Sequence, residues 1–198
     1  MRIFTLAACL LMLAFTASAG VLGVDFASPS TDSTNGEWSL GYQFTTNQAV
    51  QVTGLSFYDD QKNGLTGSHD VGIYDSAGTL LASTTVTNAD PLISWFRVHD
   101  LGTPLSLAAG QTYYVVAETG SENYTWNPNG FTVNPAINFV ADAYVSSAVL
   151  AFPTSATGGG TIGWFGANVV LASIPEPATF ALLAVGLVGL GLLRRRRA

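Results

Sequence analysis

The stretch that decides the fold reads Val71-Gly-Ile-Tyr74, then Asp75-Ser-Ala-Gly78, then Thr79-Leu-Leu-Ala-Ser-Thr-Thr-Val-Thr87. The two outer runs are rich in Val, Ile, Thr and Tyr, which favour a pleated, half-buried strand. The four residues between them are turn formers, and Gly78 accepts a positive φ without steric cost. The stretch therefore predicts two strands, 71–74 and 79–87, paired in a tight hairpin across 75–78.

The same signature recurs on both sides of this hairpin, as short apolar runs separated by Gly, Asn, Asp and Ser. Residues 20–174 show no helical period, so the pattern predicts an all-β fold, an antiparallel β-sandwich or jelly roll. Further strands are expected at 24–26, 38–46, 49–59, 93–99, 112–118, 137–144, 149–152 and 162–171. The glycines at 158–160 are expected to form a turn before the last of these.

The run 49–59 changes its alternation halfway. Val50 and Val52 share one parity, whereas Leu55 and Phe57 share the other. We expect a bulge at Gly54, because one extra residue there would turn all four side chains toward the core.

Residues 20–174 are acidic and free of cysteine, and their length suits one domain. They contain two cations, Lys62 and Arg97, against twelve acids, a net charge of −10 compared with −6 for the whole chain. Without cysteine there is no disulfide, thiolate metal site or cysteine nucleophile in this segment. The charge excludes nucleic acid as a partner and repels anionic lipid, since both demand Lys and Arg.

The segment 175–198 has a different organisation. The segment begins with an extended, exposed triplet, Pro175, Glu176 and Pro177, because proline does not enter a helix interior. The run 178–193 carries no charge. As a helix it would cover about 24 Å, somewhat less than the roughly 30 Å hydrocarbon core of a membrane. Four arginines follow and would resist translocation: Arg194, Arg195, Arg196 and Arg197.

This order of parts resembles the PEP-CTERM sorting signal of Gram-negative bacteria, over residues 174–198. The resemblance implies that a membrane-embedded enzyme, exosortase, recognises Pro175, Glu176 and Pro177. It also implies a transmembrane helix at 178–193 that anchors the protein in the inner membrane before processing. After processing, the protein is expected at the cell surface or in the extracellular space. Proteins of this kind are linked to exopolysaccharide and biofilm matrix. An ordinary C-terminal membrane anchor is the alternative interpretation.

The N-terminus agrees with export. Met1-Arg2 is a positive n-region, 3–16 is apolar, and Ala17-Ser18-Ala19 is a small-x-small cleavage site before Gly20. Residues 1–19 are therefore predicted to be a signal peptide for the general secretion machinery, removed by signal peptidase. Cys9 would be discarded with it.

The predicted domain 20–174 carries its own resemblance. The stretches 54–58, 70–82, 93–98 and 107–115 are similar to a family of bacterial extracellular β-sandwiches of unassigned function. The matching residues are mainly structural, so the likeness supports the fold and implies no particular activity.

A polar loop and an adjoining residue suggest a cation site. Asp59, Asp60 and Asp70 supply oxygen ligands close in sequence, the kind that Ca²⁺ prefers. The competing interpretation is a solvated turn, because Asp and Asn are the usual turn residues of β-domains and Lys62 lies within the loop. No other cofactor is expected.

Aromatic residues are the remaining candidates for ligand binding. Tyr124 and Trp126 lie in a polar, loop-like segment and could present a platform for sugar rings, with Trp164 among the other aromatics. Packing in the core is the alternative. Trp38 and Trp95 are expected in the core, because they lie in predicted strands.

No catalytic residues are predicted. The chain has no GxSxG elbow and no HExxH motif. His69 and His99 are expected at the surface, and His99 and Asp100 cannot form a dyad because neighbours on a strand point to opposite faces. The sequence thus favours a non-enzymatic exported matrix or adhesion component. A carbohydrate-binding module is the first alternative, and a small hydrolase is the second.

Overall fold

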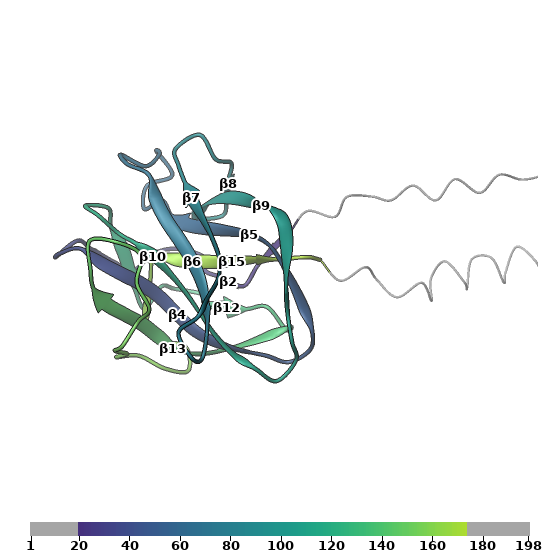
Figure 1. Cartoon of the computed structure of the whole chain (residues 1–198). Coiled ribbons are helices and arrows are strands. Elements are labelled where there is room, and N and C mark those ends of the chain that lie inside the picture. The colour runs from purple at the N-terminus through teal and green to yellow at the C-terminus, as the bar shows by residue number, and fades with distance from the viewer. Residues whose placement is uncertain (1–19, 174–198) are drawn as a thin grey trace, which may run out of the picture.

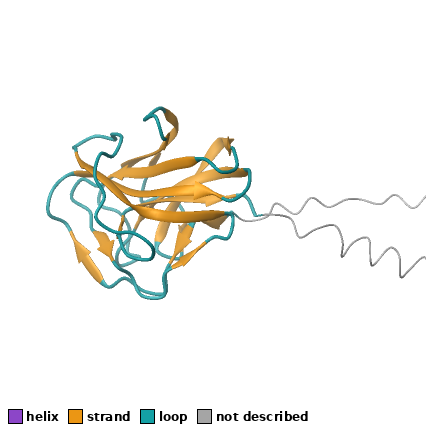
Figure 2. Cartoon of the chain, turned by 90° about the horizontal axis from the view of Figure 1, so that it is seen from below, coloured by secondary structure: helices purple, strands orange, loops and turns teal. Residues whose placement is uncertain are grey.

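The computed structural model describes residues 20–173, and every regular element in that range is a β-strand paired antiparallel (Figure 2). This confirms the predicted all-β, antiparallel class. Residues 20–173 contain no helix that could span a lipid bilayer. The predicted signal peptide, 1–19, and the predicted transmembrane helix, 178–193, lie outside the described residues.

Two five-stranded sheets form the body of the domain (Figure 1). The first has the order β1 (Val21–Leu22), β15 (Ala167–Leu171), β5 (Val50–Tyr58), β9 (Phe96–Leu107) and β8 (Leu92–Ile93). The second has the order β13 (Ile137–Ser146), β4 (Trp38–Thr46), β10 (Thr112–Glu118), β6 (His69–Asp75) and β7 (Leu80–Val86).

Short strands complete the fold. A three-stranded sheet joins β14 (Trp164–Phe165), β11 (Tyr124–Trp126) and β3 (Thr31–Ser33), and a two-stranded one joins β12 (Thr132–Val133) and β2 (Val24–Asp25).

The core lies between the two large sheets. One hydrophobic cluster takes Phe44 and Val115 from the second sheet and Leu55, Phe57 and Val169 from the first, all fully buried. Each such side chain contributes roughly 1.5–3 kcal/mol when it leaves water. With no cysteine in this range, this packing carries the stability.

The predicted bulge and hairpin are both present. β5 has one extra residue relative to β15, because Leu171 pairs with Val52 and Val170 with Gly54, and all four apolar side chains of the predicted strand lie in the core cluster. β6 pairs with β7 across the expected turn, where Gly78 has φ +84°. Asp75 accepts hydrogen bonds from the backbone N–H groups of Ala77 and Thr79, and the bond from Thr79 is the main cause that lowers the pKa of this carboxyl.

Two predicted strands were wrong in their extent, and a third, at 149–152, is not a strand. The run 93–99 is divided between β8 and β9 by a turn at Ser94, with φ +55°, and β9 continues through Pro104 to Leu107. The run 162–171 is divided into β14 and β15 at Gly166. The run 149–152 is irregular, because Phe152 packs across the outer face of the second sheet, on the rings of Tyr74 and Tyr114.

The described chain begins and ends on the same side of the domain (Figures 1 and 2). β1 pairs with β15, so Val21 lies opposite Leu171. Trp38, the first residue of β4, lies at the opposite end from Thr46, the last, which contacts the β9–β10 loop.

Candidate functional site

An aromatic pocket opens at the end of the domain away from the chain termini. It has a volume of about 180 Å³, and its lining is formed by Asn35, Trp38, Leu40, Tyr124, Tyr144 and Trp164. These residues come from the β3–β4 loop, β4, β11, β13 and β14. No charged side chain takes part in the lining.

The aromatic rings of the pocket pack against one another in pairs, with steep angles between the ring planes. Trp164 meets Tyr124 edge-on, with centroids 5.2 Å apart and planes at 79°. Trp38 meets Tyr144 in the same way, at 5.7 Å and 85°. Edge-to-face contacts of this kind are favourable because the positive edge of one ring meets the negative face of the other. The walls are therefore held in place by their own packing.

Asn35 connects the two aromatic pairs of the pocket, since it contacts Trp38 of one pair and Tyr124 of the other. Its amide oxygen accepts a hydrogen bond from Trp38 Nε1, 3.0 Å away, and another from the Tyr124 hydroxyl. Because both bonds use the oxygen, the amide nitrogen of Asn35 is turned away from these donors, and it makes no hydrogen bond within residues 20–173. An exposed amide donor thus stands beside aromatic faces.

Asp142 positions the wall formed by Trp164. This fully buried carboxylate accepts hydrogen bonds from Thr157 N (2.7 Å), Thr157 Oγ1 (2.8 Å), Gly158 N (2.8 Å) and Trp164 N (3.2 Å). Four donors satisfy the buried charge, as burial of a carboxylate requires. The bonds tie the glycine-rich turn at 158–160 and the start of β14 to β13.

The predicted sugar platform needs correction. Tyr124 does not face solvent, since its exposed fraction is 3% and it forms an inner wall of the pocket. Trp126 is half-buried against Trp164, with centroids 5.0 Å apart, and does not line the pocket. Trp38 and Trp95, expected in the core, are both half-buried. Trp95 packs at the edge of a small hydrophobic cluster that includes Phe26, and Lys62 Nζ lies 3.7 Å above its ring.

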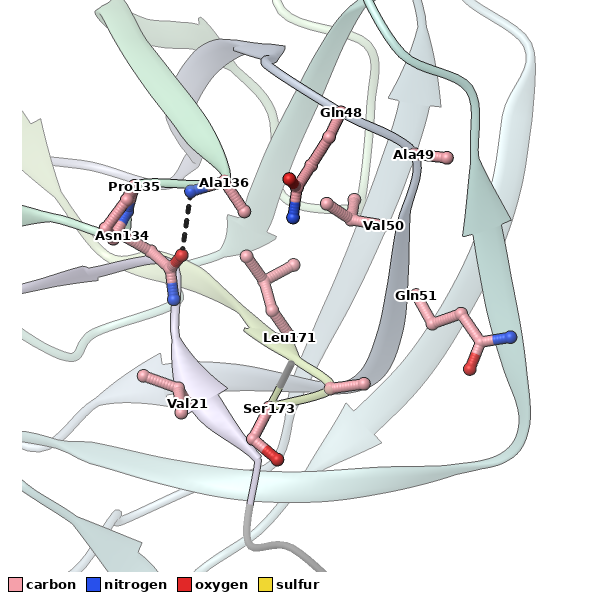
Figure 3. Close-up of a pocket in the computed structure, with 11 residues that line it drawn as sticks. Val21, Gln48, Ala49, Val50, Gln51, Asn134, Pro135, Ala136, Leu171 and Ser173 are labelled. Carbon is pink, nitrogen blue, oxygen red and sulfur yellow. Dashed lines mark hydrogen bonds between the residues drawn. The ribbon is translucent and has the colours of Figure 1, made fainter. Parts of the chain in front are cut away.

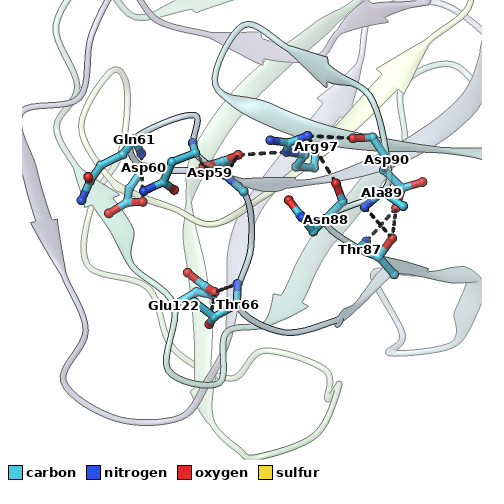
Figure 4. A network of polar contacts seen from close by, with 12 residues as sticks. Asp59, Asp60, Gln61, Thr66, Thr87, Asn88, Ala89, Asp90, Arg97 and Glu122 are labelled. Carbon is cyan, nitrogen blue, oxygen red and sulfur yellow. Dashed lines mark hydrogen bonds and ion pairs between the residues drawn. The ribbon is translucent and has the colours of Figure 1, made fainter.

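The three predicted calcium ligands do not converge, and Figure 4 shows the contact of one of them, Asp59, with Arg97. Asp59 is buried and accepts hydrogen bonds from Arg97 Nε (2.8 Å) and from the N–H groups of Asn63 and Gly64. Asp60 bonds Asn123 Nδ2, whereas Asp70 lies on β6 and accepts from Thr85 Oγ1. Among residues 20–173, no three His, Cys, Asp or Glu side chains gather where they could hold a metal ion.

The histidines have acidic neighbours that the sequence did not indicate. His69 is buried, contrary to the prediction, and its ring stacks on Phe57 at 4.0 Å with Nδ1 3.0 Å from the Glu118 backbone oxygen. His99, whose side chain is 43% exposed, has Nδ1 2.9 Å from Asp90 Oδ1. Asp90 also accepts from the N–H of Thr87, so this pair closes the turn before β8.

A larger pocket lies at the other end, and Figure 3 shows the residues that line it. It has a volume of about 490 Å³ and lies beside the strand pairing that brings Val21 and Leu171 together. Gln48, Gln51 and Asn134 provide polar groups around it, and no charged residue lines it.

Fold and site together define a small antiparallel β-domain with an aromatic pocket opposite its termini. The chain belongs to the family described as Domain of unknown function (DUF4082), whose model matches residues 25–161. Residues 173–197 match the PEP-CTERM protein-sorting motif. The comparison with curated proteins finds no match.

These matches confirm both resemblances seen in the sequence. The sorting motif indicates an exported protein that exosortase processes, with a cell-surface or extracellular destination. The predicted sorting residues Pro175, Glu176 and Pro177 and the four arginines lie within the matched range but outside the described residues. Ala17 and Ala19 of the predicted cleavage site also lie outside the described residues.

Proposed function

We propose that the protein is a non-enzymatic component of the extracellular matrix, which holds a sugar ring of an exopolysaccharide in the aromatic pocket. The observation that carries this proposal is the pocket itself: four aromatic rings around a fixed amide. The sorting motif supports the matrix location, because it directs the chain out of the cell.

The chemistry of the pocket suits a neutral sugar. The apolar C–H face of a pyranose packs on an aromatic ring, while its hydroxyls need polar partners at the rim. Asn35 offers an amide donor there. The volume of about 180 Å³ is smaller than the roughly 300–1,000 Å³ of pockets for drug-sized ligands, so one ring or a chain end fits rather than an oligosaccharide.

The carboxylates support a role without catalysis. A glycosidase needs two carboxyl groups that converge across a cleft. The two buried acids of the described part, Asp59 and Asp142, are instead engaged by several internal donors each, and neither lines the aromatic pocket.

Calorimetry tests this proposal on the exported, processed protein. We expect binding of at least one neutral polysaccharide from a panel. Trp164→Ala should weaken it about tenfold or more, which corresponds to about 1.4 kcal/mol. Trp95→Ala is the matched control, because this half-buried tryptophan does not line the pocket. Equal losses in both variants, or no heat with any polysaccharide, would remove the sugar-binding proposal.

A further inference from the structure

The end of the domain where the chain leaves is built from uncharged loops. We call it the tail end and define it by residues 47–49, 108–111, 134–136 and 172–173. Backbone hydrogen bonds of 2.8 Å tie these segments to the sheets and to one another: Asn47 N to Ala136 O, Gly110 N to Thr46 O, and Ala172 N to Gln51 O. None of the four segments contains an acidic or basic residue.

The larger pocket continues this uncharged surface. Its lining mixes small apolar side chains with the amides of Gln48, Gln51 and Asn134 (Figure 3). Two acids lie in the adjoining elements: Asp75 accepts hydrogen bonds from N–H groups of its own turn, and Asp25 Oδ1 accepts from Phe26 N and from Ser94 Oγ at 2.7 Å.

The opposite end carries the charge. Glu37 precedes β4, Asp59 and Asp60 follow β5, and Glu118 and Glu122 lie at and after the end of β10. Contacts hold these segments together there: Thr119 N donates to Trp38 O at 2.8 Å, and Asn123 Nδ2 donates to Asp60 Oδ2 at 2.7 Å. A domain with a net charge of −10 thus has more of its acidic residues at the end opposite the tail, and we call that end the charged end.

The length of the connection fixes which end faces the membrane. β15 ends at Leu171, and the apolar run begins at Ala178, so six residues join them. Fully extended, they span at most about 20 Å. When the apolar run is inserted, the tail end is therefore the part of the domain closest to the bilayer.

We propose that the tail end is a docking face for the phospholipid headgroup surface, on which the domain rests while its tail is inserted. The proposal rests on the transmembrane helix that the sequence predicts at 178–193 and is independent of the sugar pocket. An anionic surface repels acidic residues within about a Debye length. The charged end is thus held away from the membrane, whereas the uncharged loops meet the headgroups without that repulsion.

Fluorescence quenching in vesicles tests this orientation. The chain from residue 20 onward has no cysteine, so Gln48→Cys at the tail end and Gln61→Cys at the charged end each give a single labelling site. Both glutamines are exposed, which makes the two variants a matched pair. The labelled proteins, residues 20–198, are inserted into phosphatidylcholine–phosphatidylglycerol vesicles that carry a nitroxide on the lipid headgroup.

We expect the dye at position 48 to be quenched several-fold more than the dye at position 61. Equal quenching at the two positions overturns the proposal. Self-quenching of the position-48 dye that rises with protein density in nitroxide-free vesicles also overturns it, since a second copy would then cover this face. Extraction with alkaline carbonate separates the two failures: a protein that washes off contradicts the anchoring, whereas a retained, unquenched one contradicts only the docking.

Discussion

At the scale of single residues, the two buried carboxylates of the described residues hold loops in place through hydrogen bonds. Asp142 gathers donors from a turn that lies fifteen to twenty-two residues further along the chain, and Asp59 gathers the loop that follows β5. A buried carboxylate without such donors would be costly, so these loops have little freedom to adopt another arrangement. The position of the pocket residue Trp164 is fixed in the same way, because its backbone N–H is one of the donors to Asp142.

Asp142→Asn should lower the free energy of unfolding by about 2 kcal/mol, because the new amide group sets a donor against N–H or O–H donors and leaves one of them unsatisfied. Asp100→Asn removes the same charge from an exposed carboxylate and should change stability by less than about 0.5 kcal/mol. Urea denaturation of both variants gives the comparison. Similar stability of the two would show that the Asp142 hydrogen bonds contribute little.

Arg97→Met should destabilise the domain by about 3–5 kcal/mol, because it leaves the fully buried Asp59 carboxylate without its cation. Arg97 also donates to the backbone oxygens of Asn88 and Asp90, so its loss loosens the turn before β8. Lys62→Met is the control. It removes the other cation of the domain, which is exposed and contributes only about 0.5–1 kcal/mol through its contact with Trp95. Thermal unfolding measures the comparison. Equal decreases in the melting temperatures of the two variants would contradict a stabilising role for the Arg97–Asp59 ion pair.

At the scale of elements, strands with one continuous buried face were predictable, whereas most short strands were not; β2, expected at 24–26, is an exception. β4 and β10 have the bounds that the sequence predicted, since their alternation spans seven or more residues. β11 and β14 contain three and two residues, too few for a period to show. The segment of β11 was predicted as a loop for that reason.

The same limit applies to the pocket. Its walls stand at positions 35, 38, 40, 124, 144 and 164, so no local pattern connects them, and the pairing of β11 with β3 and β14 creates the site. The sequence singled out Tyr124 and Trp164 by residue type alone. It gave no sign of Asn35, whose role depends on hydrogen bonds with Trp38 and Tyr124.

Gly78→Ala tests the hairpin that decides the fold. Gly78 has φ +84°, a conformation that costs other L-residues about 1–2 kcal/mol, so we expect a loss of stability of that size. An added Cβ would meet only ordinary contacts, 3.4 Å from the Phe152 ring, so sterics add little. Gly102→Ala is the control, since its Cβ would have no neighbour within 4 Å and its φ is not positive. Equal melting temperatures would show that the turn tolerates a side chain.

At the scale of the whole molecule, the domain has two ends with separate roles. The termini and the uncharged loops share one end, and the aromatic pocket and most of the acids share the other. The antiparallel pairing of β1 with β15 is the cause of this arrangement, because it sends both ends of the chain out on one side (Figure 1). A tail-anchored molecule would therefore present its pocket away from the bilayer.

This polarity predicts that membrane anchoring leaves the pocket accessible. A polysaccharide that binds the processed protein should bind residues 20–198 in vesicles with a dissociation constant within about twofold, because neither the lipid nor the uncharged loops reach the Trp38–Trp164 region. Binding to the two forms can be compared by sedimentation with fluorescent polysaccharide, and Trp164→Ala vesicles give the background. A tenfold weaker affinity in vesicles, about 1.4 kcal/mol, would mean that the pocket lies against the membrane and that the two ends are not separate.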